Sequence, residues 1–228
     1  MCRYIKGIIF DLDGVITDTS HYHYLAWKRL ADEINIYFDE KMNNRLKGID
    51  RMASLEILLG QSSARYTEEQ KLMLADKKNS YYRELIDTIT PDNLYTGIHE
   101  LFDRIKQKNI KTALASVSKN APKVIKKLQI EKLFDAVVDA NLVVKGKPDP
   151  EIFIKAADML GLKCHECAVI EDSRAGITGA KAAGMVAVGI GTRYLLPEAD
   201  VVYERTADIK LEEIDEAAGK YCLPENTA

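Results

Sequence analysis

The chain has 228 residues, of which 46% are hydrophobic and 29% charged, so it can bury a sizeable core and is expected to be globular. Its 32 basic and 35 acidic residues give a net charge of -3, which excludes a strong long-range attraction to nucleic acid or anionic lipid. The chain reaches the polar segment DLDG at residue 11, too early for the apolar region of a signal peptide, and no later apolar run reaches membrane-spanning length. We therefore expect a cytoplasmic monomer with no nucleic-acid or membrane partner.

The four cysteines, Cys2, Cys164, Cys167 and Cys222, are too few and too scattered to form a disulfide framework in a chain of this length. Reduced thiols are therefore expected. The spacing of Cys164 and Cys167 permits a metal or redox site, but no second Cys or His pair completes a four-ligand zinc site. The sequence therefore favours no function for this motif.

The first part of the chain predicts one strand followed by a helical block. Residues 4–10 are rich in β-branched and aromatic side chains and stop at Asp11, which is typical of a buried strand that ends in a turn. Between about Ser20 and Asp87 only helical patterns occur, with an apolar stripe that includes Trp27. The predicted helices of this block span residues 24–34, 39–46, 53–59 and 68–86.

From residue 97 onward, helices and strands alternate. Helices are predicted at residues 97–108, 121–128, 151–160 and 175–183, and strands at residues 111–115, 136–138, 168–170 and 185–190. A last strand at residues 201–203 and an amphipathic helix at residues 209–218 complete the pattern. This alternation predicts an α/β fold with a doubly wound, Rossmann-like parallel sheet, whose ligands bind at the carboxyl ends of the strands.

The helical block interrupts this alternation and is interpreted as an insertion. We assign residues 1–16 and 91–228 to an α/β core domain, and residues 17–90 to a helical cap domain. The two connections, residues 14–19 and 88–93, contain Gly14 and Pro91 and are expected to act as hinges. The cap is thus expected to close over the ligand as a lid.

Acidic side chains follow two of the predicted strands. Asp11 and Asp13 come directly after the first strand and project to the same side if the extended geometry continues. Glu171 and Asp172 follow the strand at residues 168–170 in the same manner. Like charges this close raise one another's pKa values unless a cation intervenes, so the cluster predicts either a shared proton or a divalent metal. Carboxylate oxygens without a matching Cys or His cluster favour Mg²⁺ over Zn²⁺.

Two further residues follow other strands and could hold a phosphate. Ser116 ends the strand at residues 111–115 and opens a polar segment before a helix, where hydroxyl and backbone N–H groups can form a phosphate cradle. Lys147 stands before another helix, in a turn that contains two prolines, and could neutralise the same phosphate.

Each of these features also has a common structural explanation. An Asp-x-Asp at a strand end is often only a turn, Ser116 can be a helix cap, and Lys147 can be solvated surface. Because the features occur in order, each after its own strand, coincidence is improbable. Together they predict one magnesium-dependent phosphate site at one edge of the sheet.

The ordered motifs resemble those of the haloacid dehalogenase superfamily over the whole chain. They are DLDGV at residues 11–15, Ser116, Lys147 with Pro148, and Glu171 with Asp172. Finer features are similar to the branch of that superfamily that interconverts β-D-glucose 1-phosphate and D-glucose 6-phosphate. They are DLDGVITD at residues 11–18, KGIDR at residues 47–51 with Ser54, and ASVSKN at residues 115–120, where Val117 replaces an expected alanine.

The resemblance implies a role for each matching residue of the core. Asp11 would be the nucleophile that forms an aspartyl phosphate, and Asp13 the general acid/base, which also offers its backbone carbonyl to Mg²⁺. Asp11 and Asp172 would be carboxylate ligands of Mg²⁺, and Glu171 a ligand or an outer-shell partner. Ser116 and Lys147 would bind the transferring phosphoryl group.

The resemblance also implies roles for the insert. Arg51 would bind a second, non-reacting phosphate. Charged residues on helices usually face water, however, and Trp27 is more simply a core residue than a sugar platform. The residues implied near the sugar are Lys47, Gly48, Ser54, Lys78, Ser118 and Asn120, and those implied at the hinge, where they link closure to Asp13, are Thr19 and His23.

The implied reaction transfers a phosphoryl group from Asp11 to glucose 1-phosphate and then, by way of glucose 1,6-bisphosphate, back to Asp11. A sugar-phosphate phosphatase on the same scaffold is the nearest alternative, because it would use the same core residues. A non-catalytic receiver module, phosphorylated on aspartate, is disfavoured by the helical block and by Asp13. Only the resemblance selects glucose among the hexose phosphates.

Overall fold

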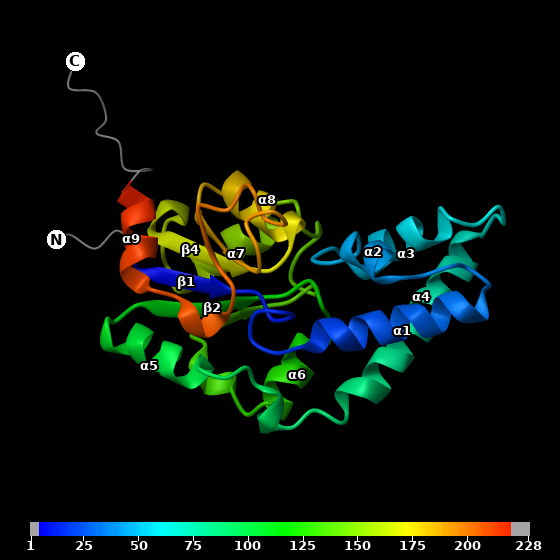
Figure 1. The fold of residues 1–228 in the computed structure, drawn as a ribbon, viewed down its shortest axis with the longest axis horizontal. Helices are drawn as coiled ribbons and strands as arrows, with labels where there is room; N and C mark the ends of the chain where they lie inside the picture. The colour runs from blue at the N-terminus through cyan, green and yellow to red at the C-terminus, as the bar shows by residue number, and fades with distance from the viewer. Residues whose placement is uncertain (1–4, 220–228) are drawn as a thin grey trace, which may run out of the picture.

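The computed structural model describes residues 5–219, which form a parallel β-sheet with helices on both faces and a group of inserted helices beside it (Figure 1). Tyr4, the predicted start of the first strand, and two cysteines, Cys2 and Cys222, lie outside the described residues. The strands are β1 (Gly7–Phe10), β2 (Lys111–Ala115), β3 (Ala136–Val138), β4 (Cys167–Glu171), β5 (Val186–Ile190) and β6 (Val201–Tyr203). Within this part of the chain, no helix is both long and apolar enough to cross a membrane.

The described sheet has six parallel strands in the order β3-β2-β1-β4-β5-β6, which confirms the predicted doubly wound α/β fold. β1 lies at the centre, where Ile9 pairs with Ala113 of β2 on one side and with Val169 of β4 on the other. The strand order changes direction between β1 and β4. In doubly wound sheets, ligands bind in the crevice at such a point.

Helices cover both faces of the sheet because each presents an apolar stripe to it. The core helices are α5 (Ile98–Gln107), α6 (Ala121–Lys127), α7 (Glu151–Leu160), α8 (Arg174–Ala182) and α9 (Leu211–Gly219). Residues such as Ile98 and Val124 pack α5 and α6 on the face that α9 also covers. On the other face, Phe153 of α7 and Ile177 of α8 form a second core. β1 is therefore buried on both sides, and its carboxyl end is held in a fixed position.

The inserted helices lie beyond the carboxyl ends of the strands (Figure 1). They are α1 (Thr19–Glu33), α2 (Glu40–Asn44), α3 (Arg51–Leu59) and α4 (Glu68–Ile86). They enclose an apolar core of their own, in which Trp27, Leu30 and Leu55 are buried. At the end of α4, Tyr82 and Ile86 are buried in the core of the sheet instead. The insert thus has an apolar core of its own, and the end of α4 is one of the places where it packs against the sheet.

Two helices of the insert begin earlier than the sequence pattern predicts. α1 begins at Thr19 rather than at residue 24, because the Asp18 side chain accepts a hydrogen bond from the backbone N–H of His21 and caps the helix. Similarly, α3 begins at Arg51 rather than at residue 53, because Asp50 caps it. Residues 19–23 carry no apolar stripe, so helical periodicity could not reveal this first turn.

The two connections between the insert and the sheet lie side by side. Thr17 forms an isolated antiparallel bridge with Leu94, and its hydroxyl donates a hydrogen bond to the backbone oxygen of Asn93 over 2.7 Å. The backbone N–H of Tyr95 donates to the backbone oxygen of Ile16 over 3.0 Å. The two connections of the insert therefore join the sheet at one place.

Candidate active site

A cavity of about 460 Å³ lies between the carboxyl ends of the strands and the inserted helices. Its walls come from both parts of the fold, and they bring together residues that the sequence predicts as site residues. The core contributes Asp11, Asp13, Ser118, Asn120 and Asp172, and the insert contributes His23, Lys47, Gly48, Arg51, Ser54 and Lys78.

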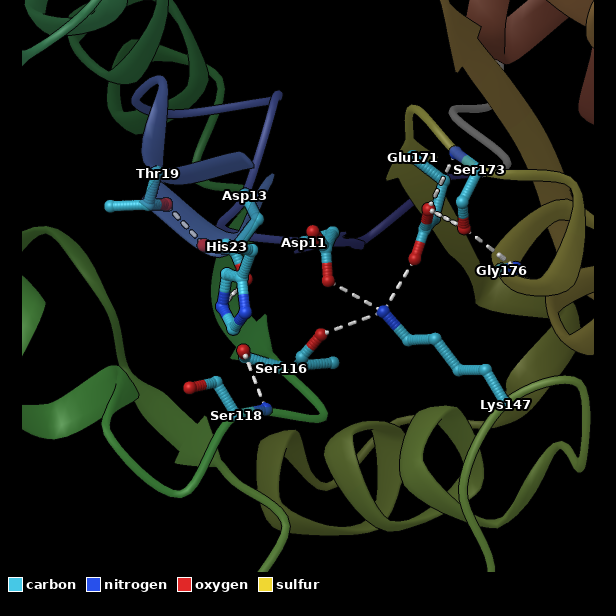
Figure 2. A network of polar contacts seen from close by, with 11 residues as sticks. Asp11, Asp13, Thr19, His23, Ser116, Ser118, Lys147, Glu171, Ser173 and Gly176 are labelled. Carbon is cyan, nitrogen blue, oxygen red and sulfur yellow. Dashed lines mark hydrogen bonds and ion pairs between the residues drawn. The ribbon is translucent and has the colours of Figure 1, made fainter. Parts of the chain in front are cut away.

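Lys147 is buried beside Asp11, where it forms ion pairs with two carboxylates (Figure 2). Its Nζ atom lies 2.6 Å from Oδ1 of Asp11, contacts Oε1 of Glu171, and donates a hydrogen bond to the backbone oxygen of Ala115 over 3.1 Å. The interpretation of Lys147 as solvated surface is therefore wrong. Burial lowers the pKa of Lys147, but the two carboxylates outweigh it and raise that pKa above its usual value, so the ammonium stays charged.

Three carboxylates lie close enough together to hold one cation. Oxygen atoms of Asp11, Glu171 and Asp172 lie within 4.8 Å of one another. Burial raises the pKa of Asp11 well above its usual value, although Lys147 opposes this. Burial also raises the pKa of Asp172 to about 7, against the opposing effect of Lys47. Because a hard divalent cation would keep such buried carboxylates ionised, the all-oxygen cluster fits Mg²⁺.

Glu171 differs from the other two carboxylates because both of its oxygens already have partners. Oε1 contacts Lys147, and Oε2 accepts hydrogen bonds from the backbone N–H (3.0 Å) and the hydroxyl (2.8 Å) of Ser173 (Figure 2). Of the two roles predicted for Glu171, this environment favours the outer one, in which Glu171 orients Lys147.

Two glycines allow close approaches to the loop after β4. Gly14 has a φ of +83°, and a Cβ atom there would lie 2.3 Å from Oδ2 of Asp172. Gly48 of the insert has a φ of +73°, and a Cβ atom there would lie 2.1 Å from Oγ of Ser173. Next to Gly48, the Nζ atom of Lys47 lies 3.3 Å from Oδ2 of Asp172. The segment of the insert that holds Lys47 and Gly48 therefore lies directly on this loop.

The loop after β2 presents Ser116, Ser118 and Asn120 to the same region. Ser116 is fully buried, and its hydroxyl oxygen accepts a hydrogen bond from the backbone N–H of Ser118 over 3.2 Å (Figure 2). Asn120, not Ser116, occupies the N-cap position of α6. The interpretation of Ser116 as a helix cap is therefore wrong, and its hydroxyl hydrogen can be donated to a phosphate oxygen.

Two side chains of the insert, Thr19 and His23, lie against Asp13. The Thr19 hydroxyl donates a hydrogen bond to Oδ1 of Asp13, and Oδ2 of Asp13 lies 3.7 Å from Nε2 of His23 (Figure 2). Nδ1 of His23 lies 2.8 Å from Nζ of Lys78. When Lys78 is charged it can only donate to Nδ1, which places the imidazole proton on Nε2, toward Asp13. Burial, reinforced by the charges of Lys78 and Arg51, lowers the pKa of His23 well below its usual value, so the ring is neutral.

Lys78 lies on α4 and is only 2% exposed, so the interpretation of this residue as solvated helix surface is wrong. Its Nζ atom lies 4.7 Å from the centre of the Trp27 ring and 5.0 Å from that of the Tyr82 ring. Burial lowers the pKa of Lys78 from 10.5 to about 7, and the charge of Arg51 adds to this effect. An anion that enters the cavity would therefore favour the charged form of Lys78.

We expect Lys78 to make the stability of the ligand-free protein rise with pH. Between the folded pKa of about 7 and the unfolded value of 10.5, the unfolded chain binds more protons, so the free energy of unfolding increases by at most about 1.4 kcal/mol per pH unit. Urea unfolding between about pH 7 and pH 9 should show that Lys78→Met loses this increase. The exposed neighbour Lys77 supplies the control Lys77→Met, which should keep it. Equal pH dependence in wild type and Lys78→Met would contradict the prediction.

Arg51 and Ser54 form part of the cavity wall on α3. The Arg51 side chain is 24% exposed, and its NH1 atom lies 3.7 Å from Oδ1 of Asp76. Burial lowers the pKa of Arg51, although Asp76 opposes this, so the guanidinium is poorly neutralised and can accept an anion. Ser54 is buried and follows Arg51 by three positions, which places both on one face of the helix.

Asp76 and Asn79 of α4 are among the residues of the cavity wall that were not predicted from the sequence. They are three positions apart and therefore share a helix face, which was the available signal. Asn79 Oδ1 accepts a hydrogen bond from Nδ2 of Asn120 over 2.9 Å. The core assignment of Trp27 is confirmed by its burial, but its side chain also lines the cavity.

The two described cysteines take no part in this site. Cys167 is the first residue of β4, at the opposite end of that strand from Glu171, and Cys164 lies in the turn before it. Burial raises the pKa of Cys164 and raises that of Cys167 to about 12. Thiols with raised pKa values react slowly, because the thiolate is the reactive form.

The comparisons with known proteins agree with this geometry. A model of the haloacid dehalogenase-like hydrolase family matches residues 5–184. Beta-phosphoglucomutase of Bacillus subtilis (strain 168) is 48% identical over 97% of this chain and 99% of that protein. A phosphorylated carbohydrates phosphatase of Thermotoga maritima is 31% identical over 79% of this chain and 82% of that protein.

A solved structure extends the similarity to the fold. The crystal structure of beta-phosphoglucomutase from Clostridium difficile matches with a TM-score of 0.89 and 43% identity, and the match covers 95% of this chain and 98% of that one. The chain therefore belongs to the haloacid dehalogenase-like hydrolase family, as its motifs predict, and within that family to the β-phosphoglucomutases.

Proposed function

We propose that this protein interconverts β-D-glucose 1-phosphate and D-glucose 6-phosphate through an aspartyl phosphate on Asp11 and a glucose 1,6-bisphosphate intermediate. The observation that carries the proposal is that one cavity combines the Asp11 centre of the core with the Arg51 and Lys78 side chains of the insert. A sugar that carries two phosphates needs positive charge at both ends. The Bacillus subtilis relative is named for the same activity.

The transferring phosphoryl group is held at the end of β1. The Asp11 carboxylate is the nucleophile, and the Lys147 ammonium and the Ser116 hydroxyl bind the phosphoryl oxygens. Asp11, Asp172 and the backbone carbonyl of Asp13 would hold Mg²⁺, which would supply positive charge to offset the charge of the transferring group. Glu171 does not bind the metal directly in this scheme, and instead it keeps Lys147 in place.

Asp13 moves the proton in both halves of the reaction. When Asp11 carries the phosphoryl group, Asp13 accepts the proton of the sugar 6-hydroxyl as that oxygen attacks phosphorus and the bond from phosphorus to the Asp11 oxygen breaks. After the bisphosphate reverses its orientation, Asp11 attacks the other phosphoryl group, and Asp13 returns the proton to the departing 1-oxygen. Burial raises the pKa of Asp13 toward the range in which one group can serve as base and as acid.

The insert holds the rest of the substrate and excludes water. Arg51 binds the non-reacting phosphate, while Thr19 and His23 couple closure of the insert to the position of Asp13. The side chains around the sugar are those of Lys47, Ser54, Lys78, Ser118 and Asn120, with the backbone of Gly48. Residues 17–90 move as a cap, because water that reached the aspartyl phosphate would hydrolyse it. A monomeric state and a cytoplasmic location stay predictions.

The experiment that tests the function measures two products at once. Purified protein receives Mg²⁺, β-D-glucose 1-phosphate and a trace of glucose 1,6-bisphosphate, and glucose 6-phosphate and free phosphate are quantified together. We expect glucose 6-phosphate to dominate, and a chelator of divalent cations to abolish its formation. Free phosphate without glucose 6-phosphate would instead support the phosphatase alternative, since the Thermotoga maritima relative is named for that activity.

Arg51→Ala is expected to lower kcat/KM for β-D-glucose 1-phosphate by about 10- to 100-fold, because a charged hydrogen bond to phosphate contributes about 1.5–3 kcal/mol. The matched control is Arg45→Ala, since Arg45 is exposed at the end of α2. Unchanged mutase kinetics in Arg51→Ala would rule out Arg51 as the anchor of the second phosphate.

A further inference from the structure

Asn79 of α4 makes a direct contact from the insert to the core. Its side chain is half-buried and lines the cavity next to Lys78. Asn79 Oδ1 accepts a hydrogen bond from Nδ2 of Asn120 over 2.9 Å. Asn120 lies in the loop after β2 and is the N-cap residue of α6, so this bond joins the two walls of the cavity.

The contact continues through a chain of hydrogen bonds to the buried Ser116. The backbone N–H of Asn120 donates to Oγ of Ser118 over 3.2 Å, and the backbone N–H of Ser118 donates to Oγ of Ser116 over 3.2 Å. Figure 2 shows the inner part of this chain, with Ser116 beside Asp11 and Lys147. The loop that presents Ser116 is therefore tied to α4 through Asn79.

A second contact between α4 and α6 lies at the connection to the sheet. Asp87, the C-cap residue of α4, lies 2.6 Å from Nζ of Lys123 on α6, and this ion pair is exposed. Asn79 and Asp87 are separated by about 12 Å along the helix axis, at about 1.5 Å per residue. A rotation of about 20° around the connection would move Asn79 by about 4 Å, which is enough to break its hydrogen bond. The Asn79 contact therefore requires a closed insert, whereas the Asp87 contact lies near the pivot.

We propose that Asn79 is a positioning residue that couples closure of the insert to the position of the loop after β2. It thereby sets how often the phosphoryl group on Asp11 is transferred to the sugar rather than to water. This inference rests on the function proposed above. With the bond formed, α4 holds Lys78 over the cavity and the loop of Ser116 is fixed. Without it, the insert opens more often during the lifetime of the aspartyl phosphate, and water gains access to Asp11.

The test compares three variants by the ratio of free phosphate to glucose 6-phosphate formed from β-D-glucose 1-phosphate. Asn79→Ala removes the acceptor and should raise the ratio by about three- to tenfold, as expected for one lost hydrogen bond. Asn79→Gln keeps an uncharged amide oxygen that can accept from Asn120 and should stay closer to wild type than Asn79→Ala does. Ser80→Ala on the exposed side of the same helix should leave the ratio unchanged. Thermal unfolding establishes that each variant is folded.

The outcomes separate this inference from the proposed function. If the wild type releases phosphate and forms no glucose 6-phosphate, the proposed function fails and this inference fails with it. If the wild type isomerises its substrate but Asn79→Ala has the wild-type ratio, only the inference is overturned. An Asn79→Gln variant that releases phosphate as strongly as Asn79→Ala would also overturn it, because the acceptor oxygen would then not matter.

Discussion

Asp13→Asn is expected to lower mutase turnover by about 10²- to 10⁴-fold, the range that general acid/base catalysis contributes. Asparagine has nearly the shape of aspartate, but its amide cannot accept the proton of the sugar hydroxyl. Its amide oxygen can still accept the hydrogen bond that the Thr19 hydroxyl donates in the wild type. Because burial already disfavours the charged form of Asp13, removal of the charge should not reduce stability.

The measurement is steady-state formation of glucose 6-phosphate, together with the urea midpoint of each protein. The control is Asp18→Asn, an identical chemical change at an exposed residue, and asparagine caps a helix as well as aspartate does. Near-normal turnover in Asp13→Asn would defeat the assignment of Asp13. A large fall in its urea midpoint would contradict the expectation that only the chemistry is lost.

Most of the core fold could be predicted from the sequence because its signals are local. The helix that was expected at residues 97–108 is observed as Ile98–Gln107, and the strand at residues 111–115 is observed unchanged. Alternation of such elements predicts a parallel sheet, but the order of the strands depends on how distant segments pair. The beginning of α1 was missed because a cap, Asp18, and not a periodic stripe, defines it.

For the candidate site as well, some features could be predicted from the sequence and others could not. Asp11, Ser116 and Asp172 each follow a strand, and a parallel sheet brings the carboxyl ends of its strands to one edge, so their proximity could be predicted. The contacts of Lys47 with Asp172 and of Asn79 with Asn120 could not. They depend on how the insert lies against the core, and no local pattern of residues encodes that placement.

Lys147→Met is expected to destabilise the ligand-free protein by about 3–5 kcal/mol near neutral pH, because removing one partner leaves buried charges uncompensated. In the wild type, the Lys147 ammonium neutralises the carboxylates of Asp11 and Glu171 and also donates to a backbone oxygen. Methionine has a similar length but no charge and no hydrogen to donate. Activity should fall by about 10²- to 10³-fold, as for loss of one preorganised donor to the transferring group.

The loss of stability in Lys147→Met should depend on pH with a definite sign. Lys147 opposes the raised pKa of Asp11, so without the ammonium that pKa rises further in the folded state, and the folded protein binds more protons than the unfolded chain above about pH 4. The destabilisation should therefore be small near pH 4 and grow as the pH rises toward 7. Added Mg²⁺ should restore part of the stability, because it supplies positive charge to the same carboxylates.

Urea unfolding of wild type, Lys147→Met and Lys145→Met across this pH range, with and without Mg²⁺, tests these statements. Lys145 lies in the same turn, but its side chain is 71% exposed and pairs only with the Asp149 carboxylate at 3.4 Å among the described residues. Lys145→Met should therefore resemble the wild type at every pH. If Lys147→Met were equally stable at all these pH values, Lys147 would not be what neutralises the buried carboxylates. The site would then depend on another cation to hold Asp11 and Glu171 together.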